Sequence, residues 1–271
     1  MIRIAIVDSG VNIHHTAFAG HCLSGFSLCV DTSGEVHREE TFHDNVGHGT
    51  AIYYLISKLT SDISEKIYID NIKIYFGDSQ QLNQASFEKI LDYIAKNYSY
   101  DIVNISMGLI CCNSIENMQN SINQLYAKGT IIVSAFDNNG AISFPAALDN
   151  VIGVDGDDAI TDIFDFRRVE NSVVNIIGRN RNLKVAWIDP PFNIVRGTSY
   201  TCCFITAHIA KQIVQNGFFR EEKICHNLIK YDKVSYDNVG FNLGRMAIFP
   251  LNKEIHAIAQ FEDLLSGTVA H

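Results

Sequence analysis

Gly197-Thr198-Ser199-Tyr200-Thr201-Cys202-Cys203-Phe204-Ile205-Thr206-Ala207-His208-Ile209-Ala210 predicts a helix around which the rest of the chain is arranged. Its apolar residues cover most of the circumference of a helix, as is typical of a helix buried inside a domain. We expect this helix to continue to Val214 and to stop at Gly217. A serine at its start suits either an ordinary helix cap or a nucleophile, because the free backbone N–H groups there favour negative charge.

The size and charge of the chain exclude several classes of protein. The chain has 271 residues, of which 47% are hydrophobic and 19% are charged, enough for one large α/β domain. A formal net charge of −9 argues against nucleic acid or an anionic membrane as the main partner. No apolar run reaches the length of a membrane span. The sequence leaves the oligomeric state open.

The N-terminus and the cysteines favour a cytoplasmic protein. The apolar run at residues 2–7 is too short for the hydrophobic region of a signal peptide. The cysteines are odd in number, include two adjacent pairs and form no C-x-x-C motif, which predicts neither a disulfide framework nor a zinc site. They are Cys22, Cys29, Cys111, Cys112, Cys202, Cys203 and Cys225. We interpret them as reduced thiols and expect no bound metal.

Predicted strands and helices alternate along the chain. Strands are predicted at residues 2–7, 72–75, 101–108, 129–135 and 150–154, and helices at 85–98, at 114–128 and from Ala51 onward. The polar residues 31–47 show no periodicity and are predicted to form a loop. This alternation favours a single α/β domain with a mostly parallel central sheet and helices on both faces.

Four polar residues lie at strand ends or helix starts: Asp8, His48, Asn138 and Ser199. Aspartate, histidine and serine in this chain order match one of the known orders of catalytic triads. In that chemistry Ser199 attacks a carbonyl carbon, His48 takes its proton, and Asp8 fixes the imidazole tautomer. Asn138 would donate its side-chain amide to the developing oxyanion.

Four sequence blocks resemble the signature blocks of the subtilisin-like serine proteases. In chain order they are Ile6-Val7-Asp8-Ser9-Gly10, Asp44-Asn45-Val46-Gly47-His48-Gly49-Thr50, Asn104-Ile105-Ser106-Met107-Gly108 and Gly197-Thr198-Ser199. The resemblance covers about residues 2–216 and implies a subtilisin-like three-layer sandwich. It also implies that Ser106, Met107 and Gly108 pair with an extended peptide substrate, and that Ala135, Phe136 and Asp137 border the primary specificity pocket.

Two blocks depart from the family pattern. At the oxyanion turn, where the family has Ala-Gly-Asn-x-Gly, the sequence is Phe136-Asp137-Asn138-Asn139-Gly140. The spacing to Gly140 favours Asn138 as the donor, with Asn139 as the alternative. Asp137 replaces a glycine of the specificity pocket, so it either selects a basic side chain or reshapes the pocket together with Phe136. After the serine, Tyr200 stands where the family has methionine.

The start of the chain bears on where the protein acts. Secreted relatives carry a signal, a propeptide and an N-terminal segment before the catalytic aspartate, whereas this chain begins on the strand of Asp8. We therefore expect an intracellular enzyme that is active as synthesised and has narrow specificity. The resemblance points to the cytoplasmic leader peptidases that mature lanthipeptide-type precursors. No cofactor is expected to be required; calcium stays an open alternative that nothing in the sequence supports.

The leading function is a serine endopeptidase that cleaves a specific peptide, such as a leader peptide, through an acyl-enzyme. A transamidase or macrocyclase would use the same triad, and a catalytically silent peptide-binding pseudoprotease would keep only the binding surface. Residues 217–271 are expected to pack on the same domain as a C-terminal extension, with a strand at 245–250 and a helix at 254–265, or to form a partner or substrate-gating surface.

Overall fold

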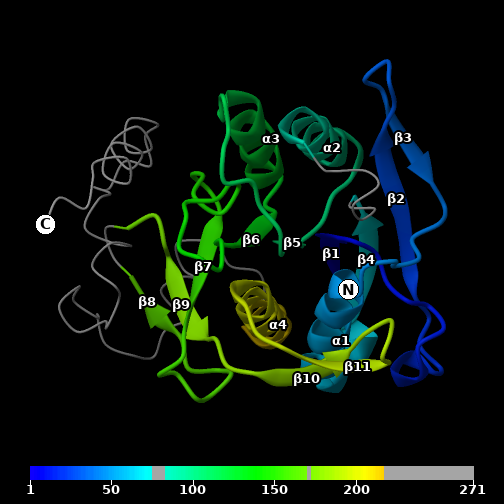
Figure 1. The fold of residues 1–271 in the computed structure, drawn as a ribbon, viewed down its shortest axis with the longest axis vertical. Helices are drawn as coiled ribbons and strands as arrows, with labels where there is room; N and C mark the ends of the chain where they lie inside the picture. The colour runs from blue at the N-terminus through cyan, green and yellow to red at the C-terminus, as the bar shows by residue number, and fades with distance from the viewer. Residues whose placement is uncertain (75–82, 170–171, 217–271) are drawn as a thin grey trace, which may run out of the picture.

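A nine-stranded sheet forms the centre of the computed structural model, which describes residues 1–74, 83–169 and 172–216 (Figure 1). The strand order is β3-β2-β4-β1-β5-β6-β7-β9-β8. The strands are β1 (Ile2–Asp8), β2 (Ser24–Val30), β3 (Val36–Glu39), β4 (Ile67–Lys73), β5 (Ile102–Ile105), β6 (Ile131–Ala135), β7 (Ile152–Asp157), β8 (Arg167–Arg168) and β9 (Ile176–Arg179). Neighbouring strands are parallel except at the two edges, where β2–β3 and β8–β9 are antiparallel.

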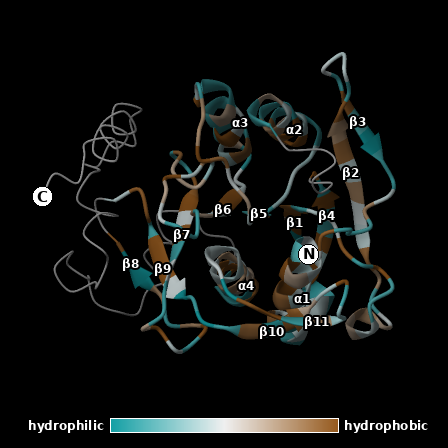
Figure 2. Cartoon of the chain, viewed as in Figure 1, coloured by the Kyte–Doolittle hydropathy of each residue, from teal (hydrophilic) through white to brown (hydrophobic). Residues whose placement is uncertain are grey.

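Helices cover both faces of this sheet (Figure 1). The helices are α1 (His48–Leu59), α2 (Gln84–Asn97), α3 (Glu116–Ala127) and α4 (Thr198–Asn216), with short 3-10 turns η1 (Thr16–Phe18) and η2 (Ser61–Lys66). One core cluster joins the sheet to α1 and α4, and a second joins it to α2 and α3, whose outer sides are hydrophilic (Figure 2). The predicted three-layer α/β sandwich is therefore confirmed.

Helix α4 is buried along most of its length, as its sequence predicts. Phe204, Ile205 and Ile209 are at most 2% exposed in the core beneath the sheet. Burying each such side chain contributes about 1.5–3 kcal/mol to the free energy of unfolding. This packing holds the N-terminus of α4, and with it Ser199, against the sheet.

Parallel pairing brings the predicted site residues to one edge of the sheet. Val7 of β1 lies opposite Ile105 of β5, and Ile105 lies opposite Ser134 of β6. Asp8 is the last residue of β1 and Ser106 directly follows β5, so both lie at the carboxyl ends of the strands, where ligands of open α/β sheets bind.

Some element predictions were wrong. Residues 31–47 were expected to be a loop, but they contain β3, whose exposed polar residues carry no hydrophobic alternation because it is an edge strand. Strand β4 begins at Ile67 rather than Ile72. The hairpin of β10 (Leu183–Ala186) and β11 (Phe192–Val195) was not predicted.

Some expectations fall on residues that the structure does not describe. Gly217, the strand at 245–250 and the helix at 254–265 lie outside the described residues. Within the described ranges, none of the helices has the length and apolar character needed to cross a bilayer.

Candidate active site

Asp8 and His48 form a close pair at the carboxyl edge of the sheet. Asp8 ends β1 and is 1% exposed. Nδ1 of His48, the first residue of α1, lies 2.8 Å from Oδ1 and 3.0 Å from Oδ2 of Asp8. An ionised carboxylate only accepts hydrogen bonds, so Nδ1 carries the proton and Nε2 is left able to accept one.

The loop that delivers His48 is tied down by Asp44. One carboxylate oxygen of this buried residue accepts hydrogen bonds from the backbone N–H groups of Val46 and Gly47. The other accepts from the N–H and the hydroxyl of Thr50. Asp44 thus satisfies N–H groups at the start of α1 that would otherwise lack partners.

Gly47 is required at the junction between this loop and α1. Its φ of +102° lies in the left-handed region, which a residue with a side chain rarely adopts. A Cβ atom here would also come within 2.5 Å of the Trp187 ring, which packs against the junction. Two independent constraints therefore favour glycine immediately before His48.

The surroundings of His48 raise its pKa above the ordinary value of 6.5. Burial alone lowers the pKa of the imidazole, because it disfavours the charged form. The charge of Asp8, its hydrogen bond and the charge of Asp44 outweigh that effect. The pair therefore stabilises the imidazolium, the form that a general base becomes when it accepts a proton.

The raised pKa predicts the pH dependence of nucleophile activation. His48 accepts a proton only in its neutral form. The reactivity of the Ser199 hydroxyl should therefore fall as the pH drops through a midpoint above 6.5. The measurement is the rate of covalent labelling by a fluorophosphonate across about pH 5 to 9. A midpoint below 6.5 would show that the Asp8 and Asp44 carboxylates do not dominate the environment of His48.

Ser199 is the second residue of α4 and is 9% exposed, and the ring centroid of the next residue, Tyr200, lies 5.7 Å from that of His48. Its hydroxyl donates a 2.8 Å hydrogen bond to the backbone carbonyl of Ser106, and within the described part of the chain it makes none with His48. The structure thus joins Asp8 to His48 but leaves the Ser199 hydroxyl bonded to residue 106. Catalytic hydrogen bonds are often loose without substrate and tighten in the complex.

A buried amide that the sequence analysis gave no role connects β5 to α4. Nδ2 of Asn104, which is fully buried, donates to the Ser106 hydroxyl at 2.7 Å. Its Oδ1 accepts from the Thr206 hydroxyl at 2.8 Å and from the Cys202 thiol at 3.3 Å. The signal in the sequence is a lone polar residue within the apolar strand Ile102–Ile105.

The turn after β6 presents Asn138 to the start of α4. Asn138 Oδ1 accepts hydrogen bonds from the backbone N–H of Thr198 at 2.9 Å and from its hydroxyl at 3.2 Å. A Cβ atom at Gly197 would lie 2.9 Å from this oxygen, so glycine allows the close approach. Asn139, the alternative donor, is exposed like Asn138, and its backbone N–H donates a hydrogen bond to the Asp137 carboxylate at 2.7 Å.

The predicted substrate-binding residues flank this site. Ser106, Met107 and Gly108 follow β5, after which Leu109 and Phe144 exchange two backbone hydrogen bonds of 2.9 Å. Phe136 is 6% exposed and belongs to the core, where its ring packs close to Gly153. Asp137 is partly exposed. Of the three residues predicted to border the specificity pocket, Ala135 and Phe136 are buried, and Asp137 has the most accessible side chain.

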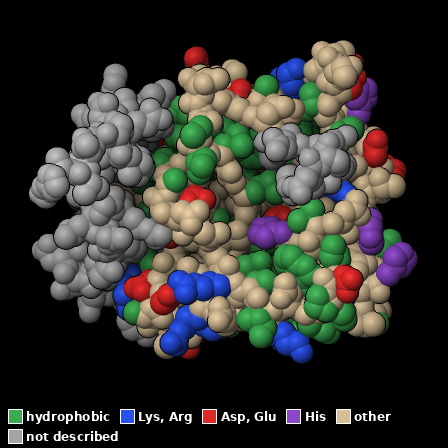
Figure 3. All heavy atoms as spheres, viewed as in Figure 1, with side chains coloured by type: hydrophobic (Ala, Val, Ile, Leu, Met, Phe, Trp, Pro, Cys, Tyr) green, Lys and Arg blue, Asp and Glu red, His purple; other side chains and the backbone are tan. Residues whose placement is uncertain are grey.

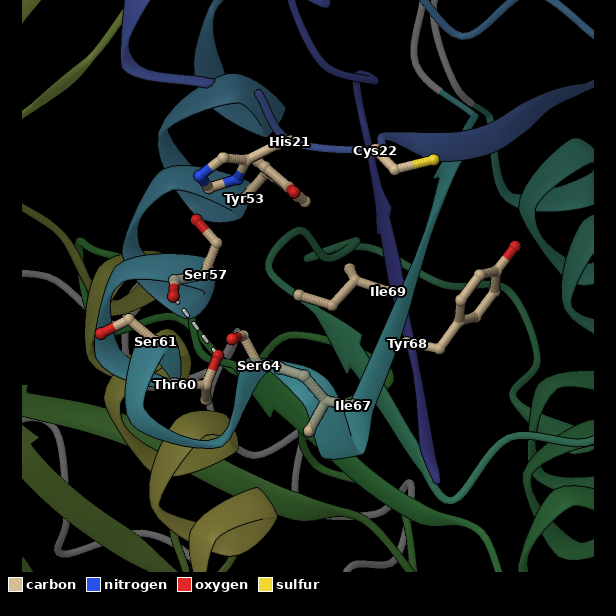
Figure 4. Close-up of a pocket in the computed structure, with 10 residues that line it drawn as sticks. All are labelled: His21, Cys22, Tyr53, Ser57, Thr60, Ser61, Ser64, Ile67, Tyr68 and Ile69. Atoms are coloured by element: carbon tan, nitrogen blue, oxygen red, sulfur yellow. Dashed lines mark hydrogen bonds between the residues drawn. The ribbon is translucent and has the colours of Figure 1, made fainter. Parts of the chain in front are cut away.

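A separate hollow of 350 Å³ lies between α1, η2 and the beginning of β4 (Figure 4). Its lining contains no Asp, Glu, Lys or Arg and consists of His21, Cys22, Tyr53, Ser57, Thr60, Ser61, Ser64, Ile67, Tyr68 and Ile69. Ile67 is the first residue of β4, whereas Asp8 is the last residue of the parallel neighbour β1. The hollow therefore lies toward the amino ends of these strands, and the Asp8–His48 pair lies at their carboxyl ends.

Charged side chains gather on the face seen in Figure 3, below and beside β8 and β9. Arg196, which directly precedes Gly197, pairs with Asp158 at 2.5 Å, and Arg167 pairs with Asp157 at 3.2 Å. In residues 1–74, 83–169 and 172–216, no three His, Cys, Asp or Glu side chains are grouped to hold a metal ion. The six described cysteines are free thiols.

Comparison with known proteins identifies similar chains. A family model described as "Subtilase family" matches residues 1–237. Subtilisin Savinase of Lederbergia lenta is 23% identical over 215 residues, which are 77% of this chain and 73% of that protein. The crystal structure of a cold adapted subtilisin-like serine proteinase superposes with a TM-score of 0.62 at 19% identity, covering 83% of this chain and 80% of that one.

Other relatives are longer than this chain. The minor extracellular protease Epr of Bacillus subtilis is 28% identical over 166 residues, which are 56% of this chain and 23% of that protein. Subtilisin-like protease 2 of Pseudogymnoascus destructans is 26% identical over 212 residues, which are 76% of this chain and 49% of that protein. The chain therefore spans less than half of the length of these two curated relatives.

Proposed function

Because the chain belongs to the subtilase family, we propose that it is a serine endopeptidase that uses Ser199, His48 and Asp8 as its catalytic triad. The observation that carries this proposal is the pairing of His48 Nδ1 with both carboxylate oxygens of Asp8, beside a serine at the N-terminus of a buried helix. That arrangement supplies a base of defined tautomer next to a nucleophile.

In the proposed reaction the Ser199 oxygen attacks the carbonyl carbon of the scissile bond, and His48 Nε2 takes its proton. The imidazolium then protonates the leaving amine, which leaves an acyl-enzyme on Ser199. Water repeats the sequence: His48 takes its proton, the hydroxide adds to the acyl carbon, and Ser199 leaves with the proton returned. Asp8 holds the imidazole and stabilises its charge throughout.

Intact-mass spectrometry after exposure to a fluorophosphonate tests this proposal. We expect a single adduct on the folded protein, and peptide mapping should place it on Ser199. An adduct elsewhere, or none on folded protein, would contradict an activated Ser199. Heat-unfolded protein is the control, because labelling that survives unfolding does not depend on the assembled site.

Asn138 is proposed to donate its amide N–H to the oxyanion. The contacts of its Oδ1 with Thr198 orient the amide beside Ser199.

Replacing Asn138 by alanine is expected to lower kcat about 10²- to 10³-fold with little change in KM. That magnitude is the one known for the oxyanion asparagine of subtilisin, a member of the same family. Asn139→Ala is the matched control. A larger loss in that control would assign the donor role to Asn139.

We further propose a narrow peptide specificity, with Asp137 selecting a basic side chain before the scissile bond. A partly exposed carboxylate at the pocket would attract such a side chain.

The role of Asp137 can be tested with paired peptides that differ only by arginine or glutamine at the residue before the scissile bond. We expect arginine to be preferred by the wild type and the preference to disappear in Asp137→Asn; an unchanged preference would exclude Asp137 as the selecting group.

The proposed physiological substrate is a precursor peptide, cut in a reducing, cytoplasmic compartment. The free thiols of the described cysteines support such a compartment, because disulfides form in oxidising ones. Incubation with a candidate precursor peptide and measurement of product mass tests the reaction. Hydrolysis adds one water to the summed product mass, whereas transamidation does not.

A further inference from the structure

Tyr200, the residue after the nucleophile, packs against the proposed base. Its ring centroid lies 5.7 Å from that of the His48 imidazole, with 47° between the two planes. Tyr200 is 5% exposed and forms part of the core around α4. The imidazole therefore has the Asp8 carboxylate at its Nδ1 edge and an aromatic ring beside it.

We propose that Tyr200 is a positioning residue of the peptidase: its ring holds the His48 imidazole and stabilises the imidazolium formed when the proton of Ser199 moves to Nε2. An aromatic ring attracts a cation within about 6 Å of its centroid, and more strongly where water is excluded. The contact thus becomes more favourable as His48 gains charge, which lowers the barrier to attack. This inference rests on the proposed peptidase function.

The effect of the Tyr200 ring on the His48 imidazolium can be separated from the effects of the other groups around His48. Asp8 from β1 and Asp44 from the loop before α1 supply negative charge, and a substitution at residue 200 leaves both in place. Burial raises the pKa of the Tyr200 phenol and of the neighbouring Cys203 thiol, so both stay neutral at physiological pH. Tyr200 therefore acts on His48 through its ring and not through a charge of its own.

Two substitutions separate the ring from its other properties. Methionine keeps a long apolar side chain beside His48 but has no aromatic ring, whereas phenylalanine keeps the ring and loses the hydroxyl. Tyr53 of α1 provides a matched control, because it is also 5% exposed, and it packs at 5.0 Å on Phe18 instead of His48. Thermal unfolding of each variant reports any general loss of structure.

The experiment is the rate of fluorophosphonate labelling of Ser199 as a function of pH. For Tyr200→Met we expect about fivefold slower labelling at the high-pH plateau and a midpoint at lower pH, because the imidazolium loses a stabilising contact. Tyr200→Phe and Tyr53→Met should stay within about twofold of the wild type. If Tyr200→Met does not fold, Tyr200→Leu makes the same comparison.

Two outcomes would overturn the proposal for Tyr200. One is a wild-type rate and midpoint in Tyr200→Met, which would make the ring contact irrelevant to His48. The other is an equal defect in Tyr200→Phe, which would transfer the effect to the hydroxyl. Absence of labelling in the wild type is a different failure, because it would contradict the peptidase function itself.

Discussion

Replacing Ser199 by alanine should lower the rate of peptide hydrolysis about 10⁶-fold, to the level supported by binding and oxyanion contacts alone. That magnitude is the one known for the nucleophilic serine of subtilisin, a member of the same family. The physical reason is that the proposed acyl-enzyme forms on this hydroxyl, which alanine removes while preserving the helix. The measurement is kcat/KM on a peptide substrate, together with loss of the fluorophosphonate adduct.

Ser121→Ala provides the control for this substitution. Ser121 is 2% exposed, and its hydroxyl donates to a backbone carbonyl at 3.1 Å, as the Ser199 hydroxyl does. It lies on α3, on the other face of the sheet. Activity should survive Ser121→Ala. Retention of more than a small fraction of activity in Ser199→Ala would show that another nucleophile performs the reaction.

Replacing Asp8 by asparagine is expected to lower kcat about 10⁴-fold. The carboxylate accepts the Nδ1 hydrogen of His48 in this structure, with N–O distances of 2.8 and 3.0 Å. An amide at residue 8 can instead donate to Nδ1, which moves the imidazole proton to Nε2 and blocks that nitrogen as a base. The buried site also loses the negative charge that stabilises the imidazolium.

Asp70→Asn is the matched control, because Asp70 is another buried carboxylate of the sheet, 6% exposed. It accepts hydrogen bonds from Ser24 and Tyr100, away from His48. Both variants lose a buried charge, but only Asp8→Asn should lose catalysis beyond its loss of stability. If the two variants lost activity in the same proportion to their loss of stability, Asp8 would contribute to folding and not to catalysis.

The fold was largely predictable because its signals are local. The burial of α4 can be predicted from the apolar residues of one continuous stretch. The alternation of strands and helices implies a parallel sheet and does not depend on the details of packing. Edge strand β3 was not predicted because it has no local signal. Its residues are largely exposed and polar, and only its pairing with β2 identifies it as a strand.

The site was predictable only in part. Asp8, His48, Asn138 and Ser199 follow strand ends or begin helices, positions that a linear pattern reveals. Their partners do not have such a pattern. Asn104 stands out as a polar residue in an apolar strand, but nothing in the sequence identifies Thr206, 102 positions away, as its partner.

The layered α/β architecture and the residue types of the proposed triad follow from the sequence alone, because periodicity and position within an element are properties of neighbouring residues. The contact of the Tyr200 ring with the imidazole and the hydrogen bond from the Ser199 hydroxyl to the Ser106 carbonyl could be found only in the folded structure. These contacts join segments far apart in the chain, and their geometry depends on how the sheet and its two helical layers pack together.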